Sequence, residues 1–128
     1  MKLLLDTCTL LWLTEEPKRL SSACRKAIDK PDNDLMVSDA SLWEMALKSN
    51  AGKLSFSVPL RRWIADQRSI WKFESLPIRE EHILRTLEIE RHHVDPFDRI
   101  LVAQALAENI PVVTPDQEIS KYPVQVIW

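Results

Sequence analysis

The chain alternates between short apolar runs and longer segments. In the longer segments, apolar and polar residues recur at helical spacing. The runs are rich in Leu and Val without polar alternation, which is typical of strands covered on both faces. Strands are predicted at residues 2–5, 35–37, 73–76, 112–114 and 124–127. Helices are predicted at 7–14, 21–29, 39–49, 59–69, 79–90 and 96–108, with a short one at 116–120. This alternation predicts an α/β fold: a three-layer α/β/α sandwich around a mostly parallel, roughly five-stranded sheet with right-handed crossovers.

Punctuating residues support these boundaries. Ser21 or Ser22 is placed to cap the second helix, and Pro59 stands at a permitted first-turn position. Gly52 follows the 39–49 helix, where a left-handed residue is favoured. Gly52 is also the only glycine in the chain, which excludes a dinucleotide-binding fingerprint and a P-loop.

Length and charge narrow the class of protein. A chain of 128 residues is expected to form a single domain, residues 1–128. Its net charge of -2 provides no overall basic field for nucleic acid, although a bound metal ion can supply positive charge locally. The apolar run after Met1 is too short for a signal peptide, and no run approaches the roughly 18 apolar residues of a membrane span. We therefore expect a cytoplasmic protein.

Four acidic residues stand at predicted strand ends or in early helical turns. They are Asp6, Glu44, Asp98 and Asp116. The carboxyl ends of parallel strands share one edge of the sheet, and ligands bind at that edge. Carboxylates gathered there repel each other by roughly 3 kcal/mol per pair at about 5 Å, with an effective dielectric constant of about 20. The pattern therefore favours a divalent metal ion at this edge.

Each acid also has a structural interpretation of its own. Asp6 and Asp116 are placed to cap the helices that follow them. Glu44 fits a capping box with Ser41, and it is also spaced to pair with Lys48.

The segment before Asp98 offers two acids for one role. Asp95 is a natural N-cap with Pro96 as the first helical residue, and Asp98 is then a first-turn acid that favours the helix dipole. Asp95 therefore competes with Asp98 as a site residue.

Several short motifs, in order, make the chain recognisable. They are LLLDT at 3–7, VSDASLWE at 37–44, Lys48 with GKL at 52–54, DPFDRILVAQAL at 95–106, and VTPD at 113–116. Over essentially its whole length the chain resembles the PIN-domain ribonucleases, and most closely the VapC-type toxins of bacterial toxin–antitoxin pairs.

The resemblance implies a metal-dependent ribonuclease. It makes Asp6, Glu44, Asp98 and Asp116 the catalytic, metal-binding acids for Mg²⁺ or Mn²⁺, with Asp6 and Asp98 as the most direct ligands. It also implies three hydroxyls that line the pocket, Thr7, Ser38 and Thr114. The implied reaction is hydrolysis of RNA to a 5′-phosphate and a 3′-hydroxyl by a metal-activated water. The implied partners are a cognate antitoxin, which inhibits the enzyme, and a second copy of the chain in a homodimer.

Contacts with RNA and antitoxin are less well marked in the sequence. Similar toxins often carry a basic residue before the DPFDR segment, where this chain has His92-His93-Val94. Arg99 and Lys48 are the candidates to hold the RNA backbone, a contact that positions a substrate without reading its sequence. A groove around Trp12 and Leu13 is predicted to receive the antitoxin.

Other functions are compatible with parts of the pattern. The three histidines, His82, His92 and His93, suggest a metal-free acid–base ribonuclease, although a solvated surface is the expected place for all three. A receiver-like signalling domain needs a second acid after the first strand, where Thr7 stands, and a lysine better placed than Lys121. A catalytically silent binding module of the same fold is the remaining alternative.

Overall fold

A parallel β-sheet lies at the centre of the computed structural model, which describes residues 1–92 and 95–128. In these residues the sheet has five strands in the order β3-β2-β1-β4-β5, with every neighbouring pair parallel. The strands are β1 (Lys2–Leu5), β2 (Asp34–Ser38), β3 (Glu74–Leu76), β4 (Val112–Val113) and β5 (Val126–Ile127). The predicted sheet is confirmed.

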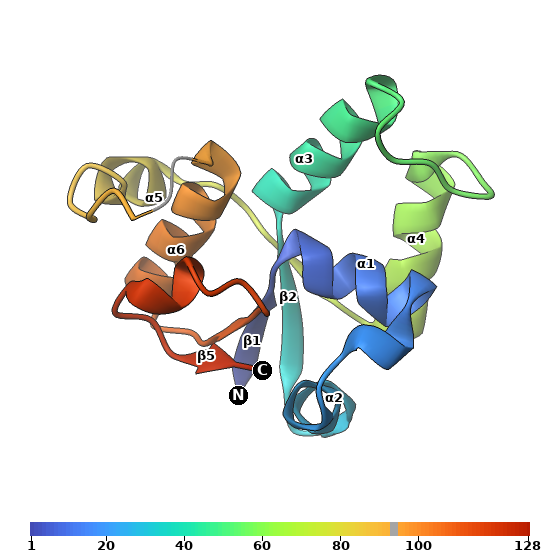
Figure 1. The fold of residues 1–128 in the computed structure, drawn as a ribbon, viewed down its shortest axis with the longest axis horizontal. Coiled ribbons are helices and arrows are strands. Elements are labelled where there is room, and N and C mark those ends of the chain that lie inside the picture. The colour runs from blue at the N-terminus through green and yellow to red at the C-terminus, as the bar shows by residue number, and fades with distance from the viewer. Residues whose placement is uncertain (93–94) are drawn as a thin grey trace.

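Helices cover both faces of this sheet, which confirms the three-layer prediction (Figure 1). One face carries α1 (Thr7–Glu15), α2 (Ser22–Asp29) and α4 (Leu60–Trp71), and the other carries α5 (Glu80–Arg85) and α6 (Pro96–Glu108). Helix α3 (Asp39–Asn50) continues directly from β2 and contacts both α1 and α6. Of the helices in the described part of the chain, none is long and apolar enough to cross a lipid bilayer.

Alternate residues of the central strands pack into two separate hydrophobic cores, one on each face of the sheet. Leu3 and Leu5 are buried with Leu10 of α1 on one side of the sheet. Leu4 points to the other side and is buried with Leu101 of α6. Both faces of β1 are therefore dry, which explains why its sequence is apolar without alternation.

Strand register brings distant parts of the chain to a common edge. Leu5 of β1 pairs with Val37 of β2 on one side and with Val113 of β4 on the other. The next residue along each strand therefore lies at the same edge, and these residues are Asp6, Ser38 and Thr114. Ser38 also caps α3 by accepting a hydrogen bond from the Ala40 N–H at 3.0 Å.

Several predicted boundaries need correction. The helix predicted at 79–90 ends at Arg85, because the Thr86 hydroxyl donates to the Ile83 carbonyl at 2.6 Å and Arg99 donates to the Thr86 carbonyl at 2.8 Å. The segment predicted as a helix at 116–120 is a short 3₁₀ turn, η2 (Ile119–Lys121). A second such turn, η1 (Pro17–Arg19), links α1 to α2. Gly52 has a φ of +71°, as its predicted left-handed conformation requires.

Candidate metal centre

The four acids singled out in the sequence line one open cleft of about 370 Å³ at the carboxyl edge of the sheet. Asp6 follows β1, Glu44 lies on α3, Asp98 lies on α6, and Asp116 follows β4. The cleft is lined by Asp6, Thr7, Cys8, Leu11, Trp12, Glu44, Lys48, Asp95, Asp98, Pro115 and Asp116. Residues more than 100 positions apart in the sequence thus share one site.

Asp6 is the most deeply buried of these acids, with 5% of its surface exposed. One carboxylate oxygen accepts from the Thr9 N–H at 2.7 Å, so Asp6 is the N-cap of α1 as well as a cleft residue. The other oxygen accepts from the Thr114 hydroxyl. Burial raises the pKa of Asp6, the hydrogen bonds from Thr114 and Thr9 oppose this, and the charge of Asp116 adds to it.

Glu44 is nearly as buried and uses both carboxylate oxygens. Its Oε1 accepts from the Thr7 hydroxyl at 2.6 Å, and its Oε2 accepts from the Lys48 ammonium at 2.9 Å. Because Ser38 caps α3, Glu44 lies inside this helix and belongs to no capping box with Ser41. The alternative pairing of Glu44 with Lys48 is real, and the two residues form it inside the cleft.

Helix α6 contributes two carboxylates from its first turn. Asp95 caps the helix by accepting from the Phe97 N–H at 2.9 Å, and Pro96 follows as the first helical residue. Asp98 lies one residue further into the turn than Phe97 and is half-buried. Both acids line the cleft, so Asp95 adds a fifth carboxylate to the four that were predicted.

Asp116 forms the fourth side of the cleft, and Thr114, which is buried and does not itself line the cleft, links Asp116 to Asp6. The Thr114 hydroxyl, which donates to Asp6, accepts from the Asp116 N–H at 3.0 Å. Asp116 also accepts from the Glu118 N–H at 2.8 Å, but it does not cap η2, whose N-cap is Glu118, so the predicted cap is wrong. Thr114 therefore ties the end of β4 to the end of β1 through Asp6.

Two predicted site residues point elsewhere. The Ser38 hydroxyl donates to the buried Gln104 side chain at 2.6 Å, and Ser38 does not line the cleft. Gln104 in turn donates to the Pro77 carbonyl at 3.2 Å, so this pair is a structural link between β2, α6 and the segment after β3. Sequence reasoning missed Gln104, because a single glutamine in an apolar helix carries no signal of its burial.

Arg99 is the second correction. Its guanidinium donates to the carbonyls of Thr86 at 2.8 Å and Glu90 at 3.0 Å, and it does not line the cleft. Arg99 holds the segment after α5 against α6. Lys48 is the predicted RNA-backbone residue that remains at the site.

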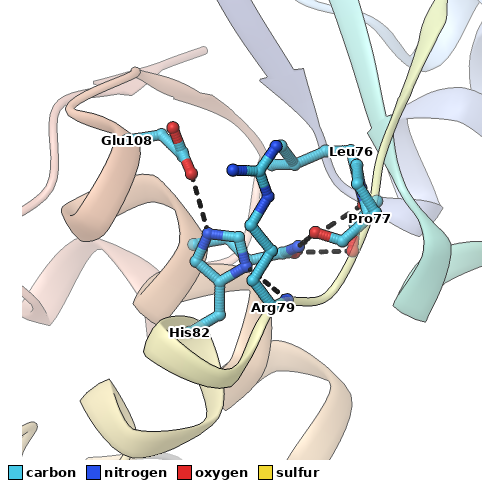
Figure 2. A network of polar contacts seen from close by, with 7 residues as sticks. Leu76, Pro77, Arg79, His82 and Glu108 are labelled. Carbon is cyan, nitrogen blue, oxygen red and sulfur yellow. Dashed lines mark hydrogen bonds and ion pairs between the residues drawn. The ribbon is translucent and has the colours of Figure 1, made fainter.

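Neither of the two described histidines, His82 and His92, lines the cleft, and the expected surface position of His82 is wrong. His82 is fully buried. Its Nδ1 accepts from the Arg79 N–H at 3.0 Å, and its Nε2 bonds Glu108 at 2.8 Å (Figure 2). His92 is exposed and bonds Glu90 at 2.9 Å, while His93 lies outside the described residues.

Glu81, His82 and Glu108 place one ligand atom each within 4.8 Å of one another. Because the Arg79 N–H donates to Nδ1, a neutral His82 must carry its proton on Nε2. The Nε2–H then donates a hydrogen bond to the Glu108 carboxylate. Neither ring nitrogen then offers a lone pair, so this corner fits a structural role better than a metal site.

The donor set of the cleft fits a hard divalent cation. It offers five carboxylates and a threonine hydroxyl, with no histidine among the described residues that line it. Mg²⁺ and Mn²⁺ prefer oxygen ligands of this kind, whereas zinc favours nitrogen and sulfur. Burial, followed by the charge of Asp6, raises the pKa of the Cys8 thiol to about 12, so Cys8 adds no thiolate at neutral pH.

Comparisons with known proteins agree with this geometry. The family model of the PIN domain matches residues 3–125. Ribonuclease VapC22 of Mycobacterium tuberculosis is 26% identical over 120 residues, which cover 93% of this chain and 90% of that protein. The chain belongs to the PIN-domain family.

Solved structures show the same fold. A DNA-bound VapBC complex from Salmonella typhimurium contains a chain that matches with a TM-score of 0.72 at 18% identity, covering 98% of this chain and 96% of the other. VapBC2 from Rickettsia felis, bound to a promoter DNA fragment, matches with a TM-score of 0.65, also at 18% identity, covering 98% and 97%.

Proposed function

We propose that this protein is a metal-dependent endoribonuclease and the toxin of a toxin–antitoxin pair, built as one nuclease domain over residues 1–128 and acting in the cytoplasm. The observation that carries the proposal is the meeting of Asp6, Glu44, Asp98 and Asp116 in one cleft of a PIN-domain protein. The relative named as a ribonuclease and the similarity to chains of VapBC complexes support the choice of RNA and of an antitoxin partner.

The residues of the cleft would hold Mg²⁺ or Mn²⁺ through Asp6 and Asp98 directly, with Glu44 and Asp116 bonding directly or through water. Asp6 and Glu44 are already oriented by hydrogen bonds from Thr9, Thr114 and Thr7, so little side-chain order has to be gained on binding. A bound divalent ion supplies an acidified water and stabilises charge on the phosphodiester.

The same carboxylates explain why cleavage would require the ion. Five acids around one cleft repel the phosphates of RNA, and Lys48 alone among the described lining residues opposes them. Lys48 is half-exposed, so its ammonium is also available to a phosphate group at the mouth of the cleft. RNA is therefore expected to enter only when a cation reverses the local charge.

Cleavage of RNA by the purified protein tests this proposal. The wild type should cut a mixed-sequence RNA with Mg²⁺ or Mn²⁺ and leave 5′-phosphate ends, and excess EDTA should stop it. Asp6→Asn and Asp98→Asn should each abolish cleavage while unfolding as cooperatively as the wild type. Full activity in both variants, or activity that survives EDTA, would contradict the proposal and favour the silent module or a metal-free mechanism.

The receiver-like alternative is not supported. The ammonium of Lys121 pairs with Glu118 at 3.0 Å, and Lys121 does not line the cleft. A receiver-like site would need this lysine beside the aspartate that follows the first strand.

The antitoxin is proposed to cover the cleft and the adjoining surface of α1. Leu13 belongs to the core and contributes nothing to such a groove, whereas Leu11 and Trp12 line the cleft itself. Co-expression with the product of a small neighbouring open reading frame, followed by purification and an RNA cleavage assay, tests the partnership. A complex that cuts RNA as fast as the isolated chain would contradict inhibition at this site.

The homodimer remains a proposal as well. Trp43 of α3 is 59% exposed and packs edge-on against Phe97 of α6 at 5.4 Å between ring centroids. Together with Ile78, Ile83 and Ile100 these residues line an almost wholly apolar hollow, of a kind that a partner surface commonly covers. Sedimentation should show a dimer for the wild type and a monomer for Ile83→Glu. A wild-type monomer at high concentration would contradict this interface.

A further inference from the structure

Lys48 occupies a singular position among the groups of the cleft. Of the described residues that line it, Lys48 is the only basic one, and it faces five carboxylates. Its ammonium lies 2.9 Å from Glu44 Oε2, on a side chain that is 49% exposed against 8% for that of Glu44. The hydrogen bond with Glu44 raises the pKa of Lys48, and the charges of Asp95 and Asp98 raise it further.

Glu44 has no oxygen left outside these contacts. The Thr7 hydroxyl occupies Oε1, and Lys48 occupies Oε2. A carboxylate oxygen has a second lone pair, but two cations on one oxygen repel each other strongly when little water separates them. A divalent ion that uses Oε2 must therefore displace the ammonium of Lys48.

Displacement is feasible because Lys48 is tethered but not enclosed. Lys48 stands four residues after Glu44 on α3, so the helix keeps the ammonium near the cleft when the ion pair opens. Half of its side chain already contacts solvent, and the flexible stem can carry the charge toward the mouth of the cleft.

We propose that Lys48 is a tethered counter-ion of the acidic cleft, which competes with the divalent ion for Glu44 and so weakens ion binding. This inference rests on the proposed metal-dependent function. In the absence of the ion, Lys48 offsets part of the repulsion among the carboxylates. When the ion enters, Lys48 gives up Glu44.

Direct titration of the protein with Mn²⁺ by calorimetry, without RNA, tests the proposal. Lys48→Gln should lower the Mn²⁺ dissociation constant by roughly fivefold, because a competing positive charge is lost. Lys53→Gln is the matched control, since it removes the same charge from an exposed residue outside the cleft lining, and it should bind Mn²⁺ as the wild type does. Lys48→Arg keeps the cation and should also stay near the wild type.

A thermal melt in EDTA gives a second readout that needs no ion. Lys48→Gln should unfold at a lower temperature than Lys53→Gln, because only the first variant breaks the ion pair with the buried Glu44. Both readouts together separate competition from a general charge effect.

The opposing outcomes are distinct. Equal Mn²⁺ affinity in Lys48→Gln and Lys53→Gln overturns the proposal, and so does weaker binding in Lys48→Gln, which would mean that Lys48 holds Glu44 in place for the ion. Neither result touches the nuclease proposal if the wild type binds Mn²⁺ and Asp6→Asn does not. A wild type that binds no Mn²⁺ overturns both.

Discussion

Two regions of the molecule gather titratable side chains, and they differ in how the charges are balanced. In the corner around His82, the buried imidazole accepts from the Arg79 N–H and bonds the Glu108 carboxylate. Each ring nitrogen therefore has a hydrogen-bond partner (Figure 2). In the cleft, five carboxylates stand around Lys48, the one basic side chain among the described residues that line it. Buried polar groups that are fully paired rigidify a fold, whereas an excess of one charge destabilises it unless a ligand compensates. The difference supports the proposal that the cleft is the functional site, whereas the corner around His82 fits a structural role.

Matched substitutions of one glutamate in each region test this comparison most strongly. Glu44→Gln should reduce metal-dependent RNA cleavage by roughly a thousandfold, since it removes a charge that faces the proposed ion. Glu108→Gln should leave cleavage per folded molecule within about twofold, since Glu108 lies outside the cleft lining. Initial rates with Mn²⁺ on the same RNA measure both. The comparison fails if the two variants lose activity equally.

Removing the His82 imidazole should affect the stability of the protein, whereas the substitution of Glu44 in the cleft affects its activity. His82→Ala deletes a fully buried ring, two hydrogen bonds and the partner of Glu108, and should lower the free energy of unfolding by about 3 kcal/mol. Urea denaturation followed by tryptophan fluorescence measures the loss. A change below about 1 kcal/mol would mean that the corner relaxes around the missing ring, and it would not be the rigid element described above.

Most of the fold is predictable because its signals are local. Strand β1 is an apolar run from Leu3 to Leu5, and α6 begins with Asp95 as cap and Pro96 as first residue. The helix predicted at 79–90 failed because its end depends on Arg99, which is far along the chain and bonds the Thr86 carbonyl. No periodicity in that segment encodes such a contact.

The site shows the same division. The meeting of Asp6 and Asp116 follows from the rule that parallel strands end at one edge, and Glu44 and Asp98 were found in early helical turns. The recognised motifs then added the hydroxyl of Thr114. The directions of Ser38 and Arg99 did not follow, because a side chain next to a site residue can point into the core or along another helix.

Helix α5 shows a failure of the hydropathy pattern itself. His82 is buried while its neighbours Ile83 and Leu84 are 54% and 53% exposed. A pattern of apolar and polar positions assigns these residues the other way round. The surface that α5 presents is consistent with the proposed dimer, in which a second copy would cover the exposed apolar residues.

The charge imbalance of the cleft also predicts how stability depends on pH. Burial raises the folded-state pKa of Asp6 above its unfolded value. At low pH, Asp6 is protonated in both states and does not destabilise the fold. As the pH rises through the folded pKa, Asp6 must ionise in a buried position, which lowers the free energy of unfolding. At neutral pH in EDTA, Asp6→Asn should therefore be more stable than the wild type. Asparagine is also a good N-cap, so the bond from Thr9 can persist.

Thermal melts in EDTA across acidic to neutral pH measure this effect. The stabilisation by Asp6→Asn should shrink as the pH falls and Asp6 becomes protonated in the wild type. A variant that is less stable than the wild type at every pH would show that Asp6 serves mainly as a cap, with no stored electrostatic cost.

The smallest expected effect distinguishes the hydroxyls of Ser38 and Thr114, which the family resemblance assigns to the same pocket. Ser38→Ala removes the cap of α3 and the bond to Gln104, and should cost about 1 kcal/mol of stability with cleavage per folded molecule unchanged. Thr114→Val removes the hydrogen bond that this buried hydroxyl donates to Asp6 and should raise the pKa of Asp6 further, because that hydrogen bond favours the ionised carboxylate. As the pH is lowered, Thr114→Val should therefore lose its affinity for Mn²⁺ at a higher pH than the wild type does. Mn²⁺ titrations at several pH values distinguish the two residues, and identical profiles for Thr114→Val and Ser38→Ala would place both hydroxyls outside the site.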